Sequence, residues 1–196
     1  MIKGWHSLVG TFTGVVVLAV ALLPVAGLVV WGLAWRRGGT SWAWRRSLAE
    51  VGMVYGTVPW VWMIMLPGGR AGDVAGQVSL VPLRDLSAIF AAGPQTATGQ
   101  VVGNLLVFAA LGFLAPLRFA ALASVPRVLA LGVGCSVLVE TAQYVLRLDR
   151  VSSVDDVLLN AAGAALAALV SRPWWHPTAM RPRTAASDLH NAETAA

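Results

Sequence analysis

The chain has 196 residues, of which 57% are hydrophobic and 12% are charged, and its mean hydropathy is +0.71. A water-soluble domain of this size needs more polar surface, so the composition excludes an ordinary soluble enzyme and predicts a membrane protein. The net charge of +5 comes from basic residues dispersed at the ends of apolar segments. Because no aromatic-interleaved basic patch accompanies that charge, we expect no nucleic-acid partner.

Metal and cofactor chemistry is not expected either. Cys135 is the single cysteine and lies in an apolar segment, which excludes a disulfide framework and a cysteine-ligated metal site. All three histidines lie outside the apolar segments, which argues against a histidine metal centre within the membrane.

Five apolar segments are long enough to cross about 30 Å of hydrocarbon at about 1.5 Å per residue. They cover residues 11–35, 48–66, 101–119, 128–146 and 154–171. The sequence therefore predicts an all-α, polytopic bundle of about five transmembrane helices within a membrane domain over residues 1–175. Residues 176–196 are rich in Thr, Ala, Pro and Arg, which predicts a disordered cytoplasmic tail.

The basic residues predict an N-out, C-in orientation. With the N-terminus outside, the inner segments contain the pairs Arg36–Arg37 and Arg45–Arg46, whereas the fewer outer basic residues are balanced by aspartates. Within the long outer loop, "VSLVPLRDLSAIF" has the apolar spacing of a short amphipathic piece on the membrane surface.

Polar residues gather near the outer ends of the last three segments. Counting the rise per residue from those ends places Asn104, Gln143 and Glu140 about 5 to 9 Å deep. Asp156 then lies at the outer mouth of the fifth segment, with Asn160 one turn further in. Three antiparallel helices thus place polar groups in one layer of the outer half of the membrane.

Spacing within each helix puts these groups on shared faces. Glu140, Gln143 and Arg147 follow an i, i+3, i+7 pattern, and Asp156, Asn160 and Gly163 follow i, i+4, i+7. Such a face turns away from lipid, because an ionised carboxylate in hydrocarbon costs several kcal/mol. The candidate ligand-binding residues are Asn104, Glu140, Gln143, Arg147, Arg150, Asp156 and Asn160.

Structural roles compete with ligand binding at several of these positions. Ser153 and Asp156 fit the S-x-x-[DE] capping box, and Asp155 suits the positive end of a helix dipole. The two asparagines are equally suited to interhelical hydrogen bonds, and Gly163 to close packing. Arg147 and Arg150 either snorkel to the interface or bind an anion. Glu140 is the residue for which a purely structural role is hardest to argue.

At these residues the chain resembles the VanZ-like family of bacterial integral membrane proteins, whose namesake is associated with teicoplanin resistance. The resemblance covers about residues 78–171, through "LVPLRDL", "GNLLVFAALGFLAPL" and "ETAQYVLRLDRVSSVDDVLLNAAG". It rests on Pro82, Asn104, Phe108, Gly112, Glu140, Gln143, Arg150, Asp155, Asp156, Asn160 and Gly163. It implies a protein of the bacterial plasma (inner) membrane that is linked to envelope or antibiotic response, and it supplies no reaction.

The chain departs from the family pattern at two positions. Ala110 stands where the family usually has proline, which puts a kink in the third helix in doubt. Ser153 stands where an aspartate is common, which leaves the local negative charge to Asp155 and Asp156.

Three functions fit the polar layer. In the first, the protein binds an amphiphile at the outer leaflet, either a lipid-linked envelope precursor or a glycopeptide or lipopeptide antibiotic. In the second, it is an enzyme acting on a lipid head group, with Glu140 as general base. In the third, it is a proton-coupled transporter with Glu140 as proton carrier. We favour binding without catalysis, because the sequence has no GxSxG or HExxH motif.

Overall fold

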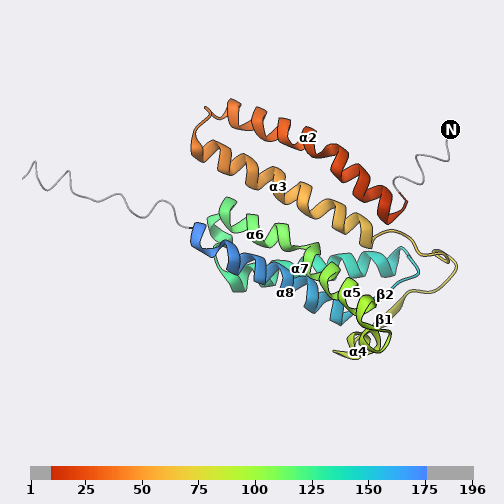
Figure 1. Cartoon of the computed structure of the whole chain (residues 1–196). Helices are drawn as coiled ribbons and strands as arrows, with labels where there is room; N and C mark the ends of the chain where they lie inside the picture. Colours follow the sequence, from red (N-terminus) through yellow and green to blue (C-terminus); the bar gives the residue numbers. More distant parts are fainter. Residues whose placement is uncertain (1–9, 176–196) are drawn as a thin grey trace, which may run out of the picture.

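The computed structural model describes residues 10–175 as a bundle of long helices that run along one another (Figure 1). The predicted all-α fold is confirmed. The long helices are α2 (Phe12–Arg36), α3 (Ser41–Ile64), α5 (Pro94–Val107), α6 (Ala109–Arg118), α7 (Val125–Val145) and α8 (Val154–Ser171). The short elements are β1 (Gln77–Ser79), α4 (Arg84–Ala91), η1 (Ala120–Leu122), β2 (Val151–Ser153) and η2 (Arg172–Trp174). The predicted tail, residues 176–196, lies outside the described residues.

The two ends of the bundle differ in structure (Figure 1). The start of α2, the loop after α3, both strands and α4 lie at one end, which we call the sheet end. The α2–α3 turn, the α6–α7 connection and the end of α8 lie at the opposite end, which we call the arginine end after Arg37, Arg46 and Arg118.

Local sequence explains where several helices begin. The Thr11 hydroxyl accepts the Gly14 N–H at 3.1 Å ahead of α2, and the Thr40 hydroxyl accepts the Ala43 N–H at 3.2 Å ahead of α3. Both are N-caps that satisfy an orphan backbone donor of the first turn. Helices α5 and α7 instead carry proline in the first turn, where a missing N–H costs nothing.

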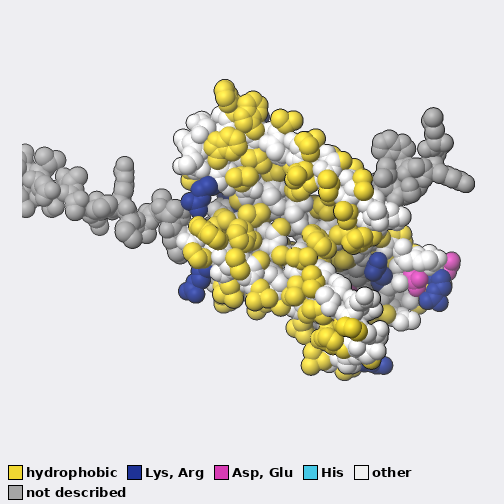
Figure 2. Space-filling model, viewed as in Figure 1, with side chains coloured by type: hydrophobic (Ala, Val, Ile, Leu, Met, Phe, Trp, Pro, Cys, Tyr) yellow, Lys and Arg dark blue, Asp and Glu magenta, His cyan; other side chains and the backbone are white. Residues whose placement is uncertain are grey.

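Four helical stretches of the described residues are long and apolar enough to cross a membrane. They are α2 (Phe12–Arg36), α5 with α6 (Pro94–Arg118), α7 (Val125–Val145) and α8 with η2 (Val154–Trp174). Their outward side chains are apolar and exposed, as lipid contact requires. On the face shown in Figure 2, hydrophobic side chains cover the middle of the bundle and charged ones lie toward its ends. Helix α3 is not among these four, so the span over residues 48–66 stays a prediction.

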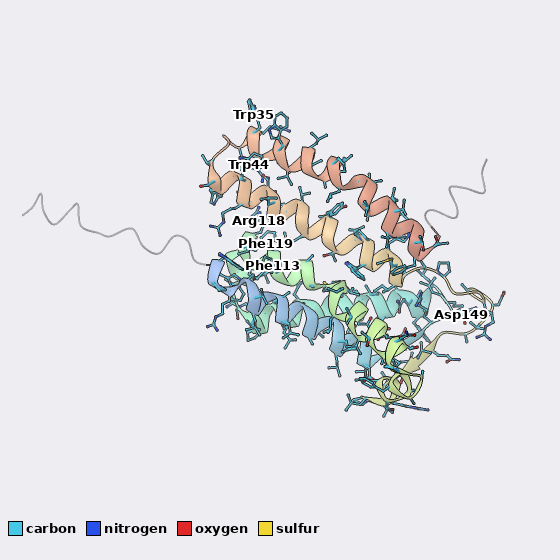
Figure 3. The ribbon with its side chains drawn as sticks, viewed as in Figure 1. Trp35, Trp44, Phe113, Arg118, Phe119 and Asp149 are labelled. Atoms are coloured by element: carbon cyan, nitrogen blue, oxygen red, sulfur yellow. The ribbon has the colours of Figure 1, made fainter. Side chains whose placement is uncertain are left out.

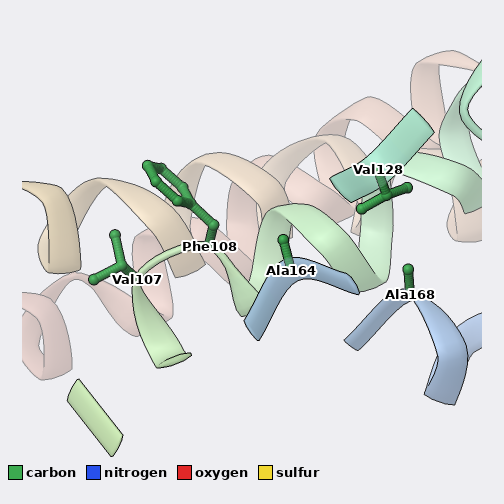
Figure 4. Packing of buried hydrophobic residues seen from close by; sticks show 5 residues of the cluster. All are labelled: Val107, Phe108, Val128, Ala164 and Ala168. Carbon is green, nitrogen blue, oxygen red and sulfur yellow. The ribbon is translucent and has the colours of Figure 1, made fainter. Parts of the chain in front are cut away.

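The predicted helix over residues 101–119 is two helices. The backbone leaves the helical conformation at Phe108, with φ −113° and ψ 14°, between α5 and α6. The break is present although position 110 is alanine, so it does not depend on proline. Figure 4 shows Val107 and Phe108 at this break, with Ala164 and Ala168 of α8 and Val128 of α7 in the same buried cluster.

Helix α8 packs backbone to backbone against α5 and α6. A Cβ atom on Gly163 would lie 2.0 Å from the Leu105 carbonyl oxygen, and one on Gly112 would lie 2.1 Å from the Ala164 carbonyl oxygen. These separations admit glycine alone, in the manner of small-residue interfaces between membrane helices. The two glycines therefore set how closely α5, α6 and α8 approach around the polar residues.

A short parallel sheet joins the long loop to the α7–α8 connection. Gln77, Val78 and Ser79 of β1 pair with residues 151, 152 and 153 of β2. The stretch predicted as one amphipathic piece is thus strand β1, a turn and helix α4. Its apolar side chains remain exposed, with Leu80 75% and Phe90 61% accessible. A three-residue strand has no local sequence signal, which is why the sheet was not predicted.

Candidate functional site

A cavity of about 470 Å³ opens at the sheet end. All the predicted ligand-binding residues except Arg147 line it. They come from α5, α7, α8 and the residue before β2. Its polar lining includes Asn104, Glu140, Gln143, Arg150, Asp156 and Asn160. Its apolar wall includes Phe12, Trp60, Met63 and Ile64 of α2 and α3.

Glu140 is buried at 8% exposure and holds the start of α8. Its Oε2 accepts the backbone N–H of Ser153 at 3.1 Å, and the Ser152 hydroxyl donates to its backbone carbonyl at 2.9 Å. A carboxylate from α7 thus satisfies a backbone donor at the N-terminus of α8, where the helix dipole favours negative charge. Glu140 therefore has a structural partner as well as a cavity position.

The predicted capping box between Ser153 and Asp156 does not form. Asp156 Oδ1 instead accepts a hydrogen bond from Asn104 Nδ2 of α5, while Glu140 takes the Ser153 N–H. The Ser153 hydroxyl still caps α8, by accepting the Asp155 N–H at 3.2 Å. Sequence spacing identified the capping serine and assigned it the wrong carboxylate, because the partner comes from another helix.

Asp155 points to α4 rather than into the cavity. Its two carboxylate oxygens accept the N–H groups of Leu83 at 2.6 Å and Leu86 at 2.9 Å. Leu83 has the left-handed backbone conformation, with φ 66°, at the start of α4. Asp155 thus caps α4 from a neighbouring element and does not line the cavity, whose acidic residues are Glu140, Asp149 and Asp156.

Asp85 of α4 contacts the start of α8 in turn, and the sequence did not predict this contact. Its Oδ2 accepts the Ser153 hydroxyl at 2.5 Å. That hydrogen bond lowers the pKa of Asp85 below its ordinary value. Side-chain hydrogen bonds in both directions therefore join the starts of α4 and α8. An acidic residue in the first turn of α4 was the only sequence signal for this contact. Asp85 reaches Ser153 because β1 pairs with β2, and the sequence did not predict that pairing.

Two cavity residues tie the α7–α8 region to the end of α3. Gln143 Nε2 donates to the Ile64 carbonyl at 2.9 Å, and Arg150 Nε donates to the Leu66 carbonyl at 3.2 Å. Arg147 is exposed, has φ 51° and lies outside the cavity lining. An anion site formed by both arginines is therefore not assembled within this cavity.

Asp149 also lines the cavity and pairs with Arg70 of the long loop, with 3.4 Å between Oδ1 and Nη2. Figure 3 shows Asp149 at the sheet end, opposite Arg118. Its Oδ2 also accepts the Arg70 backbone N–H at 3.1 Å. This contact holds the long loop against the rim of the cavity.

Asn160 is the most deeply buried polar residue of the lining, at 1% exposure. Its Nδ2 donates to the Ser136 hydroxyl at 2.8 Å. Its Oδ1 has no hydrogen-bond partner among residues 10–175. A buried carbonyl oxygen without a donor is costly, so a ligand donor at this position gains a hydrogen bond that the protein has left open.

Acceptor oxygens dominate the chemistry of the cavity. Glu140, Asp156 and Asn160 offer acceptors, whereas Arg150 is the one cationic side chain of its lining. Such a lining suits hydroxyl, amide or ammonium groups. Within residues 10–175, no three His, Cys, Asp or Glu side chains are grouped closely enough to hold a metal ion.

Glu140 also lines an apolar groove of about 320 Å³. Glu140 lines both spaces, so the polar cavity and the apolar groove meet at this residue. The groove runs between the first strand and α7 and continues to α8. Its apolar lining is Val78, Leu80, Val137, Tyr144, Val154 and Val157.

A family model described as VanZ/LLP1 matches residues 53–176. The match includes every residue of the polar cavity except Phe12. No curated protein and no solved structure matches the chain.

Proposed function

The chain belongs to the VanZ/LLP1 family, and from that premise we propose that this multi-pass membrane protein binds an amphiphile at the sheet end. The polar head group occupies the cavity lined by Asn104, Glu140 and Asn160. The apolar chain lies in the groove lined by Val78, Val137 and Val157 and continues into the surrounding lipid.

The position of Glu140 between the two spaces carries this proposal. A cavity rich in acceptors and a groove lined by valines share this one side chain. An amphiphile has the same division, with a polar end that must keep its hydrogen bonds and an apolar end that must stay out of water. A small soluble ligand would not need the groove.

The lining also restricts the head group. Asn160 Oδ1 and the Glu140 and Asp156 carboxylates accept hydrogen bonds, so the head group must supply donors such as hydroxyl or amide N–H. With the N-terminus outside, the cavity faces the outer leaflet. Glycan- or peptide-bearing amphiphiles fit, which means a lipid-linked envelope precursor or a glycopeptide or lipopeptide antibiotic.

The test is mass spectrometry of the lipids and amphiphiles that co-purify with the full-length protein. Wild type should retain a hydroxyl- or amide-rich species that Glu140→Gln retains about tenfold less, since one charge-assisted hydrogen bond is lost. Asp73→Asn is the matched control, because Asp73 is an exposed carboxylate outside the cavity lining. Equal retention by all three proteins would contradict the proposal.

Antibiotic response is tested separately. We expect expression of wild type in a susceptible bacterium to raise teicoplanin tolerance, and Glu140→Gln at equal membrane level to remove that increase. Retained species with unchanged tolerance would support an envelope precursor over an antibiotic as the ligand.

The pair of carboxylates supports a second candidate, an enzyme acting on the same head group. Glu140 and Asp156 both line the cavity, and two carboxylates can divide the roles of general acid and general base. Under this proposal, the retained species is chemically altered on incubation with wild type. Asp156→Asn should then abolish this chemical change while the species is still retained. If wild type also leaves the species unchanged, the enzyme candidate is excluded and the binding function remains.

A further inference from the structure

A second pocket, of about 420 Å³, lies at the arginine end, on the opposite side of the bundle from the polar cavity. It lies between the start of α3, the end of α6 and η2. Three arginines and three tryptophans line it, and its lining contains no acidic residue: Arg45, Arg46, Arg118, Trp42, Trp174 and Trp175.

Glu50 orients two of these arginines from behind the pocket. Its Oε1 accepts the Nε–H groups of Arg46 at 3.2 Å and Arg118 at 2.5 Å. Its Oε2 accepts Arg37 Nη2 at 2.6 Å. Since Glu50 itself does not line the pocket, it fixes the guanidinium groups without filling the space in front of them.

The outer donors of both guanidinium groups remain free. Within residues 10–175, the Nη groups of Arg46 and Arg118 make no hydrogen bond. Arg45 adds a third positive charge and uses Nη2 to bond the Trp174 carbonyl at 3.2 Å. The Glu50 carboxylate thus contacts three arginines, and Arg45 adds a fourth positive charge that does not contact it, so the excess positive charge lies at the pocket. Guanidinium forks in this arrangement match the oxygens of a phosphate group.

The tryptophans place this pocket at a membrane surface. Trp42 is 62% and Trp174 52% exposed, as is typical of indoles at the boundary between lipid and water. Arg46 lies over the Trp42 ring, with 5.1 Å between Cζ and the ring centroid. Figure 3 shows Trp44, Phe113 and Phe119 at the same end as Arg118. A phosphate bound here thus has aromatic side chains at the level of a lipid head group.

We propose that this pocket binds the phosphate group of an anionic phospholipid in the leaflet at the arginine end. The site is separate from the amphiphile cavity in position, charge and leaflet. Bound lipid would contact α3, α6 and η2 together and so would fasten the end of α8 to the α2–α3 hairpin.

The test uses full-length protein, stripped of lipid in a non-ionic detergent, and native mass spectrometry with added phosphatidylglycerol or phosphatidylcholine. We expect phosphatidylglycerol to bind about tenfold more tightly than the zwitterionic lipid, because the net negative charge is recognised. Raising NaCl from about 0.1 M to about 0.5 M should weaken this preference, since the pocket is partly exposed. Equal affinity for the two lipids in wild type would overturn the proposal without any variant.

Arg45→Gln is the informative variant, because Arg45 does not touch Glu50, and it should lower phosphatidylglycerol affinity about tenfold. Arg127→Gln is its control: Arg127 lies at the same end, is exposed and also donates to a backbone carbonyl, of Ala121 at 2.8 Å, but does not line the pocket. Equal affinity of the two variants would refute the pocket as the site. Added inorganic phosphate tests whether the lipid chains contribute. If phosphate displaces phosphatidylglycerol, the pocket recognises the phosphate group alone; if it does not, the lipid chains are also required.

Discussion

The carboxylate of Glu140 on α7 accepts the backbone N–H of Ser153 at the start of α8, with 3.1 Å between Oε2 and N. The residue that separates the polar cavity from the apolar groove is therefore also a cap for the next helix. Loss of the side chain and loss of its charge have different consequences, which allows stability and binding to be measured apart.

Glu140→Ala should lower the free energy of unfolding by about 1 to 3 kcal/mol, because the buried Ser153 N–H loses its acceptor. Glu140→Gln should cost less, because the amide oxygen still accepts that hydrogen bond. Denaturant or thermal unfolding in detergent measures both. Thr141→Ala, on an exposed neighbour whose hydroxyl bonds only its own helix, should stay within about 0.5 kcal/mol of wild type. Equal losses for the alanine and glutamine variants would contradict the capping role.

Gly163→Ala should destabilise the bundle by about 1 to 3 kcal/mol or prevent its assembly, because the new methyl group meets the Leu105 carbonyl at 2.0 Å. The Leu105 backbone can make room for this methyl group only if α5 moves away from α8. Gly134→Ala is the matched control in α7, since a Cβ at Gly134 meets no atom within 4 Å. That change should alter stability by less than about 1 kcal/mol. Thermal unfolding of the two variants side by side makes the comparison.

Asn104 and Asp156 should be energetically coupled through the hydrogen bond that joins α5 to α8. In a double-mutant cycle of Asn104→Ala and Asp156→Asn, we expect an interaction energy of about 0.5 to 3 kcal/mol. Asn104→Ala should lower the free energy of unfolding more in the wild-type background than in the Asp156→Asn background, because a partly buried carboxylate without a donor costs more than a partly buried amide without one. Strict additivity of the two changes would show that this contact contributes nothing.

The lowered pKa of Asp85 predicts a specific dependence of stability on pH. The hydrogen bond from Ser153 keeps this carboxyl ionised in the folded state below its ordinary pKa of 3.8. A depressed folded pKa contributes stability that is complete above the unfolded pKa and is lost as pH falls through the folded pKa. The melting temperature of wild type should therefore exceed that of Asp85→Asn near pH 6, and the difference should shrink below about pH 4.

Asp73→Asn serves as the control for charge in this pH series, because Asp73 is exposed and makes no side-chain hydrogen bond to another described residue. Its melting temperature should follow wild type throughout. Ser153→Ala removes the donor. Near pH 6, the difference in melting temperature between Ser153→Ala and the Ser153→Ala, Asp85→Asn double variant should therefore be smaller than the difference between wild type and Asp85→Asn. A wild-type advantage that persists unchanged at low pH would contradict the assignment to Asp85.

Apolar length, the motifs and the depth count were enough to predict the helical bundle, the family and a layer containing Glu140, Asn104 and Asn160. These properties are local, or follow from a rise of about 1.5 Å per residue applied to antiparallel helices. The depth count could not show that Arg147 would leave the layer. Its φ of 51° is decided by the turn that leads into β2, and the sequence contains no signal for that turn.

Partners across helices were decided by the tertiary structure alone. Asp155 fits the start of its own helix by spacing and caps α4 instead, and Asp156 bonds Asn104 instead of Ser153. Glu50, which the sequence did not single out, orients arginines from α3 and α6. From the sequence alone, the lengths of the apolar segments and the rise per residue determined which groups lie at the same depth. Which groups touch depended on helix rotation and close packing at Gly112 and Gly163, which only long-range contacts specify.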